Sequence, residues 1–115
     1  MALITVNWDL PPEEKMDKYK EKAFITHEER PSWITNVMKQ KGFKELRAYR
    51  NPYHTTPQVL IFCEFNNLDS CMKYIESKDY TTFISELREV GCTNISAQFW
   101  GTSPMVPEPI KSQNY

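Results

Sequence analysis

The chain has 115 residues, a formal net charge of −1, and an ordinary composition of 40% hydrophobic and 25% charged residues. This length fits a single domain with a real core, and oligomerisation would help so small a domain to bury its surface. The near-zero net charge gives no long-range attraction, so neither nucleic acid nor a membrane is expected as a partner. The sequence has no apolar run of about eighteen residues and no signal-like N-terminus, which predicts a cytoplasmic protein.

The three cysteines, Cys63, Cys71 and Cys92, are widely spaced and form no Cys-x-x-Cys pair. No histidine is placed to complete a zinc site with them, so no metal site is expected. Free cysteine behaves as a small buried hydrophobe, which predicts three structural thiols. His27 is expected on the surface beside two glutamates. His54 lies in a loop and could reach the mouth of a pocket.

The first 42 residues predict a strand followed by an interrupted helix. Residues 2–8 alternate in character, with Ile4, Val6 and Trp8 on one face. Helical spacing begins after Pro12, because proline suits the first position of a helix. The helix must break or kink around residues 28–31, where a proline cannot donate its amide. A second segment is expected to turn four apolar side chains inward, namely Trp33, Ile34, Val37 and Met38. Gly42 should end it.

Two strands joined by a hairpin loop are predicted next. Residues 43–53 read as an extended stretch with Leu46 and Ala48 on one face, and the loop ends at Pro57. Residues 59–65 are apolar at six of seven positions, which favours a strand in the middle of a sheet and buried on both faces.

Asn67 is a plausible cap for a second helical region, and Gly91 should close it. Its expected apolar face is interrupted by a hitch at residues 77–79 and comprises Cys71, Met72, Ile75, Tyr80, Phe83, Ile84 and Leu87. Residues 93–100 form the last predicted strand. The proline-rich residues 102–115 are expected to be an extended tail, either loose or draped over a neighbour.

The predicted fold is therefore α+β and ferredoxin-like, with the order βαββαβ and both helical regions on one face of a four-stranded antiparallel sheet. Residues 1–101 would form this domain and residues 102–115 the tail. The other face of the sheet would mix large apolar side chains with polar ones, more than a monomer usually exposes. We expect a second copy to stack on it sheet to sheet, leaving a partly polar cavity. This homodimer face is expected to include Thr5, Asn7, Tyr49, Phe62 and Gln98.

The βαββαβ order, Asn7 on the first strand and the run from Val59 to Phe83 resemble the dimeric α/β-barrel proteins of the antibiotic-biosynthesis-monooxygenase type. The resemblance covers about residues 2–101. That family includes cofactor-free quinol monooxygenases, haem-degrading enzymes and proteins without known activity. Haem-degrading members resemble this chain only at Asn7. Their tryptophan is Phe65 here and their histidine region carries Asp79 and Tyr80, so iron ligation by the family's route is not expected. No cofactor is predicted.

Seven residues of the presumed cavity face are the candidate site. The resemblance implies that Asn7 orients a substrate carbonyl or activates oxygen-bearing intermediates, but it could equally hydrogen-bond across the dimer. Arg47 beside Tyr49 would suit a phenolic or acidic ligand, although Arg47 could also be solvated or paired with a glutamate. Glu64 could act as a base if it is buried, or could lie at the rim. The expected lining of the ligand site is completed by Phe62, Gln98 and Trp100.

Two functions follow from this reading. The first is a cofactor-independent monooxygenase acting on a small aromatic or quinol-type molecule, with Asn7, Tyr49 and Glu64 as catalytic residues. The second is a non-catalytic dimer that binds a small molecule in the same cavity or serves a structural role. The absence of the family's tryptophan and histidine favours the second function.

Overall fold

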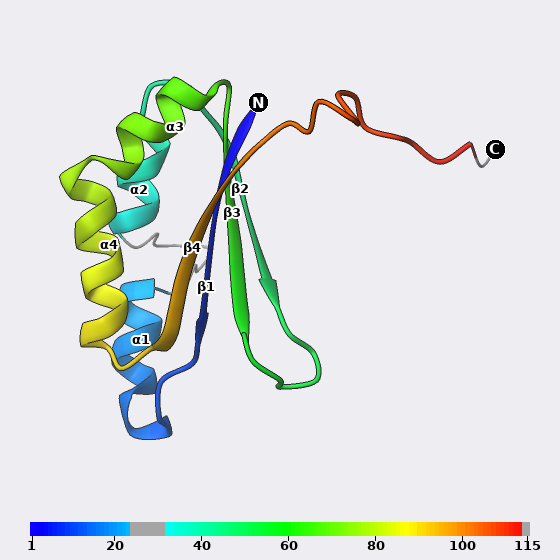
Figure 1. Ribbon diagram of the computed structural model, residues 1–115. Coiled ribbons are helices and arrows are strands. Elements are labelled where there is room, and N and C mark those ends of the chain that lie inside the picture. Colours follow the sequence, from blue (N-terminus) through cyan, green and yellow to red (C-terminus); the bar gives the residue numbers. More distant parts are fainter. Residues whose placement is uncertain (24–31, 114–115) are drawn as a thin grey trace.

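The computed structural model describes residues 1–23 and 32–113, which form a four-stranded antiparallel sheet with helices on one face (Figure 1). The strands lie side by side in the order β2-β3-β1-β4 and comprise β1 (Ala2–Asp9), β2 (Phe43–Arg50), β3 (Val59–Phe65) and β4 (Thr93–Gly101). The helices are α1 (Met16–Ala23) after the short 3-10 turn η1 (Glu13–Lys15), α2 (Ser32–Met38), α3 (Leu68–Ile75) and α4 (Lys78–Glu89). The predicted ferredoxin-like βαββαβ fold is confirmed. The break predicted at residues 28–31 and the surface position of His27 lie outside the described residues.

Local side-chain chemistry sets the ends of the second helical region. Asn67 caps α3, because its Oδ1 accepts a hydrogen bond of 2.9 Å from the backbone N–H of Ser70. Ser77 caps α4 in the same manner through the N–H of Tyr80 at 3.3 Å. The predicted cap and the predicted hitch are thus both present, and each marks the start of a helix.

Gly91 lets the chain turn from α4 into β4. Its φ of +92° belongs to the left-handed region that favours glycine. An added Cβ would lie 2.8 Å from Cδ of Lys15, so that flexible side chain would have to shift. The positive φ therefore explains the predicted helix stop.

The core lies between the helices and one face of the sheet. Trp8 is at its centre: its indole N–H donates to the hydroxyl of Tyr19 at 3.2 Å, and its ring meets Phe83 edge to face. Phe83 also stacks on Trp33 with ring centroids 4.3 Å apart. The strand residues that face these rings are buried and comprise Ile4, Val6, Val59, Ile61, Cys63 and Phe65. Such interlocked aromatic side chains contribute burial and ring contacts together.

Some predicted core positions differ in the structure. Ala48 is on the predicted side of the sheet but exposed, since β2 is an edge strand. Met38 and Met72 are also exposed. Tyr74, which is not part of the predicted helix face, is buried in α3 against Phe65. β3 is mid-sheet as predicted, but within one chain only alternate residues are buried and those between them are half-buried.

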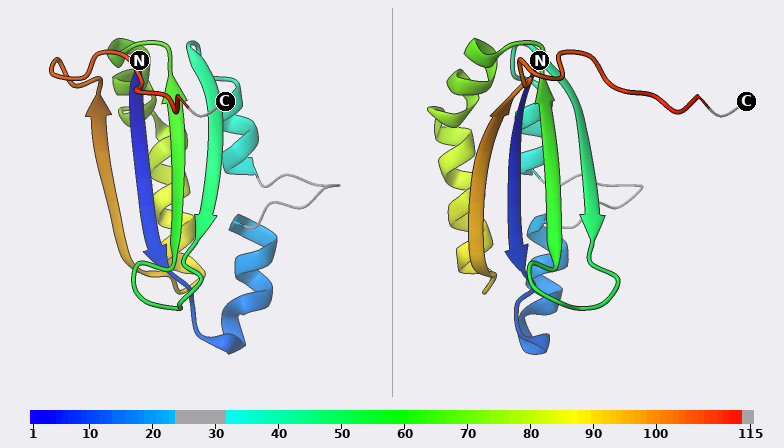
Figure 2. Two further views of the ribbon diagram at one scale, coloured as in Figure 1. Left: turned by 90° about the vertical axis from the view of Figure 1, so that its right-hand side faces the viewer. Right: turned by 45° about the vertical axis from the view of Figure 1, so that its right-hand side comes forward.

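Residues 102–113 leave the end of β4, cross the same end of the sheet and extend away on the side opposite the helices (Figures 1 and 2). They contain no helix or strand and every one is exposed. The division into a domain and a tail stays a prediction. Among the described residues, no helix is long and apolar enough to cross a membrane.

Candidate functional site

The sheet face that the helices leave uncovered, here called the open face, carries the candidate site (Figure 2). Strand pairing places three residues of each strand on it: Leu3, Thr5, Asn7, Glu45, Arg47, Tyr49, Leu60, Phe62, Glu64, Ser96, Gln98 and Trp100. All seven site residues predicted from the sequence are among them. The predicted alternation therefore assigns these residues to the correct face of every strand.

The middle of the open face holds a shallow apolar hollow of about 380 Å³, here called the central hollow. Its lining residues come from three strands and are Leu3, Thr5, Asn7, Leu60, Phe62, Gln98 and Trp100. Among the described residues, the side-chain amide of Asn7 has no hydrogen-bond partner, so its N–H and C=O groups are available to a ligand. The central hollow therefore combines apolar walls with one free amide.

Thr5 fixes one wall of the central hollow. It is buried, donates to Oε1 of Gln98 at 3.1 Å and accepts from the indole N–H of Trp100 at 2.9 Å. Gln98 in turn donates to Oγ of Ser96 at 2.6 Å. This chain of hydrogen bonds orients the Trp100 ring, which is still 52% exposed. The sequence placed Thr5 only at the dimer face, because a lone threonine gives no signal of such a role.

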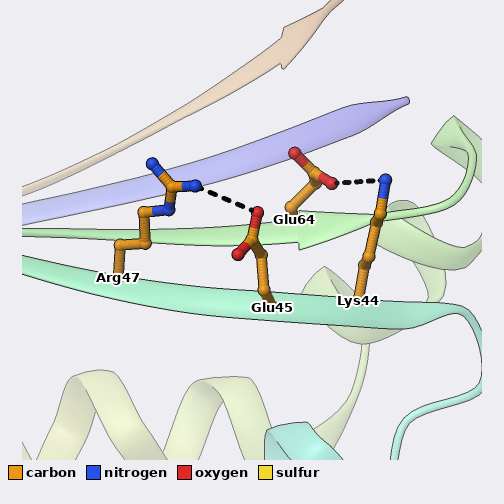
Figure 3. A network of polar contacts seen from close by, with 4 residues as sticks. All are labelled: Lys44, Glu45, Arg47 and Glu64. Atoms are coloured by element: carbon orange, nitrogen blue, oxygen red, sulfur yellow. Dashed lines mark hydrogen bonds and ion pairs between the residues drawn. The ribbon is translucent and has the colours of Figure 1, made fainter.

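A second hollow of about 190 Å³, here called the charged hollow, adjoins the first and shares Leu3 and Phe62 with it. Its other lining residues are Glu45, Arg47, Tyr49 and Glu64. Two ion pairs border it: Nζ of Lys44 to Oε2 of Glu64 at 3.2 Å, and Nη2 of Arg47 to Oε1 of Glu45 at 3.5 Å (Figure 3). The two carboxylates come from paired residues, Glu45 and Glu64, and the basic groups of Arg47 and Lys44 lie on either side of them (Figure 3).

The register shift between Phe43 and Glu45 explains the pairing of Glu64 with Lys44. A bulge lets two residues of one strand oppose one residue of the next and redirects their side chains. Because a bulge depends on cross-strand register, the sequence gave no sign of this ion pair. The Glu64 side chain is only 18% exposed, with Oε2 engaged by Lys44. The alternative that Arg47 pairs with a glutamate is confirmed by its contact with Glu45.

Tyr49 lies away from the helices, as predicted, but its surroundings differ from those expected. Its ring meets Phe62 edge to face at 5.4 Å, and it is 46% exposed within one chain. A hydrogen bond with Tyr49, followed in size by the charge of Glu45, raises the pKa of Arg47. The expected neighbours Asn7 and Gln98 lie on β1 and β4, two and three strands away, so of the three predicted partners only Arg47 is adjacent.

The thiols and His54 do not line this site. All three cysteines are buried and free, as predicted. Burial raises the pKa of Cys63 and of Cys92 to about 12, which keeps both thiols neutral. His54 is exposed in the β2–β3 loop. Within residues 1–23 and 32–113, no three His, Cys, Asp or Glu side chains gather as metal ligands would.

No protein-family model matches the sequence, and no curated protein matches it either. Solved structures do match the fold. A provisionally assigned antibiotic biosynthesis monooxygenase from Deinococcus radiodurans is 11% identical, covers 99% of this chain and 100% of its own, and gives a TM-score of 0.69. SnoaB, a cofactor-independent oxygenase from Streptomyces nogalater, is 11% identical over 93% of this chain and 95% of its own, with a TM-score of 0.57.

A dimeric ferredoxin-like protein of unknown function from Bacteroides fragilis is 15% identical over 86% of this chain and 93% of its own, with a TM-score of 0.54. At such identities the likeness shows the fold. The protein therefore has a ferredoxin-like α+β fold, which it shares with these structures, and the predicted resemblance is confirmed as a likeness of fold.

Proposed function

We propose that two copies of the chain stack open face to open face and enclose the central hollow as a cavity. Half-exposed aromatic side chains, Tyr49 and Trp100, stand beside half-buried Leu60 and Phe62 on a face that no helix covers. Apolar area of this kind on a small protein marks an interaction surface. Stacked sheets lie about 10 Å apart, which leaves room for a flat ligand between the walls. The dimeric state of the Bacteroides fragilis protein of the same fold supports this arrangement.

Within that cavity we propose a cofactor-independent monooxygenase that acts on a small phenol or quinol. The observation that carries this proposal is the free amide of Asn7 in an aromatic hollow that adjoins the charged hollow of Arg47 and Tyr49. The substrate ring would pack on Phe62 and Trp100, while the Asn7 amide would donate to a substrate oxygen.

In the reaction a phenolate gives electrons to O₂, and Arg47 with Tyr49 stabilises the anion. Glu64 would accept the phenol proton. One oxygen atom forms a C–O bond as the ring C–H bond breaks. The other oxygen atom leaves as water with the ring hydrogen and the phenol hydrogen. The substrate supplies all the electrons that the second oxygen atom takes up, so the balance of phenol and O₂ against quinone and water needs no added reductant.

Oxygen uptake with a panel of hydroquinones and naphthols tests this activity. Asn7→Ala should lower kcat/KM by about tenfold or more, the loss expected for one transition-state hydrogen bond. Asn66→Ala, an exposed asparagine off the open face, is the matched control and should leave kcat/KM unchanged. Uptake no faster than autoxidation in buffer for every substrate would contradict the proposal.

Sedimentation tests the dimer separately. Interfaces of obligate dimers are large and apolar at their centre, so the chain should sediment as a dimer at micromolar concentration. A monomer under those conditions would remove the enclosed cavity and the catalytic proposal with it.

A non-catalytic binding protein is the second candidate, and the ion pairs of the charged hollow favour it. Glu64 and Arg47 are engaged by Lys44 and Glu45, which suits a structural use of their charges. Titration with a hydroquinone under nitrogen separates the two functions. Binding at micromolar concentration without oxygen uptake in air would select the binding protein.

A further inference from the structure

The two edge strands of the sheet are protected very differently. β2 carries four charged residues among eight, Lys44, Glu45, Arg47 and Arg50, and a bulge. Such features discourage another strand from pairing with an edge. β4 is nine residues long and contains no charged residue and no proline. A long, uncharged edge with unpaired backbone groups is a template for strand addition.

An apolar groove lies beside the free edge of β4. It has a volume of about 260 Å³ and is lined by residues of α4 and β4: Tyr80, Thr81, Ile84, Ser85, Arg88, Ile95 and Ala97. Phe99 lies on the same side of β4 and is half-exposed. Among the described residues Arg88 makes no ion pair. The groove therefore offers apolar walls and one available positive charge.

The tail has the properties of a segment that fills such a groove. Met105 and Ile110 are each 87% exposed, although both are large and apolar. The backbone N–H of Val106 donates to the carbonyl of Ser103 at 3.2 Å, so a turn closes at Val106, and the backbone bends again at Glu108. Val106 and Glu108 each precede a proline, which favours extended backbone. Because of the turn and the bend, residues 106–110 would have to straighten when they pair with an edge strand.

The prolines of the tail define which of its edges can pair. Alternate residues of a strand direct their backbone groups to the same edge and their side chains to the same face. Val106, Glu108 and Ile110 have backbone N–H groups and share one edge, whereas Pro107 and Pro109 share the other. The N–H of Val106 would exchange its bond to Ser103 for one to the sheet. Proline is accepted in a sheet only where its nitrogen faces outward from an edge strand. Residues 106–110 can therefore add to an existing edge and then close it.

We propose that residues 106–110 of one protomer add as a fifth strand to the free edge of β4 in the partner copy. The inference rests on the proposed dimer. Val106, Glu108 and Ile110 then face the groove together. Glu108 pairs with Arg88, and its apolar neighbours cover Ile84 and Phe99.

The course and length of the tail indicate the partner copy. The tail leaves on the side where the partner's sheet would stack and leaves its own β4 edge bare (Figures 1 and 2). Residues 102–105 link β4 to the strand segment, and when extended they span about 13 Å, slightly more than the separation of about 10 Å between stacked sheets. The turn at residues 103–106 would open for residues 106–110 to reach the partner.

Disulfide trapping tests the arm in the full chain. Chains carrying Ile84→Cys alone and chains carrying Ile110→Cys alone are co-expressed and oxidised, so that only a bond between chains can join the two positions. The native thiols are buried and do not compete. We expect a disulfide-linked dimer on a non-reducing gel. Pro109→Cys, one residue earlier and on the opposite face, is the matched control and should give at least fivefold less product.

A charge swap provides the second measurement. Glu108→Arg in the Ile110→Cys chain should lower the trapped fraction severalfold, and Arg88→Glu in the Ile84→Cys chain should restore it. A chain that sediments as a dimer but gives no trapped product overturns the arm and leaves the proposed dimer intact. A disulfide within one chain of an Ile84→Cys/Ile110→Cys variant, without linkage between chains, also overturns it. A monomeric chain overturns both proposals.

Discussion

The two faces of β3 show what this fold does with a single strand. Ile61, Cys63 and Phe65 point toward the helices and are at most 2% exposed. Phe62 and Glu64 point the other way, stay half-buried, and border the two hollows. On the helix-facing side, aromatic rings pack closely against one another. On the open face, polar side chains form hydrogen bonds and ion pairs beside two hollows. Alternation along one strand thus separates the buried core from the open face with its two hollows.

Replacing Phe65 by alanine should be the most damaging of the changes considered. Its ring is fully buried and contacts Phe43 and Tyr74. Truncating a buried phenylalanine costs about 3–5 kcal/mol through lost burial and the cavity left behind. Urea denaturation followed by circular dichroism measures the loss.

Phe62→Ala is the matched control from the other face of the same strand. Losing its half-buried ring should lower the free energy of unfolding by less than about 2 kcal/mol. The larger effect should be on dimer dissociation, measured by sedimentation. Equal losses of stability in the two variants, with no change in dimerisation, would mean that the open face is part of the core and not a dimer interface.

Cys63→Ser tests whether the helix-facing side of the sheet excludes water. Burying a hydroxyl there without a partner should cost about 1–3 kcal/mol. The raised pKa of Cys63 means that the unfolded chain ionises first as the pH increases. Stability should therefore decline as the pH rises from the ordinary thiol value of 9.0 toward about 12, and less steeply in Cys63→Ser. Urea midpoints at pH 7 and pH 10 test both effects.

Thiol labelling provides the control for burial. A disulfide reagent should modify the native protein only at the rate of unfolding, whereas Ser96→Cys, exposed on the open face of a dilute monomer, should react at once. Rapid labelling of Cys63 in the native state would show that this side of the sheet is open.

Thr5→Val should have a smaller effect, since it keeps the volume but removes the hydroxyl that joins Gln98 to Trp100. Leaving the indole N–H without its acceptor should cost about 1–2 kcal/mol. Trp100 should also lose its fixed orientation, seen as a red shift of tryptophan emission. Thr102→Val, in the exposed tail, controls for the threonine change. An unchanged spectrum would mean that the hydrogen bonds do not position the ring.

The strand alternation explains why the sequence predicted the face of every site residue. Side chains of period two follow from the backbone alone, so Asn7, Tyr49 and Gln98 could each be assigned to a face. Their mutual distances depend on the strand order β2-β3-β1-β4, which separates Tyr49 from Gln98 by the width of the sheet. Two residues on the same face of the sheet can therefore be too far apart to act in one site.

Other features were beyond sequence reasoning for physical reasons. The Lys44–Glu64 ion pair depends on a bulge, whose position is set by register. The exposure of Ala48 depends on which strand forms the edge of the sheet. By contrast, the cap at Asn67 and the turn at Gly91 were readable because both are decided by neighbouring backbone groups.

The smallest expected effect on stability, and the most informative one on function, belongs to Tyr49→Phe. The change keeps the ring on Phe62 and removes the hydroxyl that contributes most to the raised pKa of Arg47. Because Tyr49 is 46% exposed, the folded chain should lose at most about 1 kcal/mol. If the hydroxyl helps Arg47 to hold a substrate anion, kcat/KM or ligand affinity should fall by about tenfold, more than the change in folding would suggest. Tyr53→Phe, an exposed tyrosine in the β2–β3 loop, serves as the control. A loss of several kcal/mol in stability with turnover untouched would assign Tyr49 to the architecture of the sheet and remove the chemical role proposed for this face.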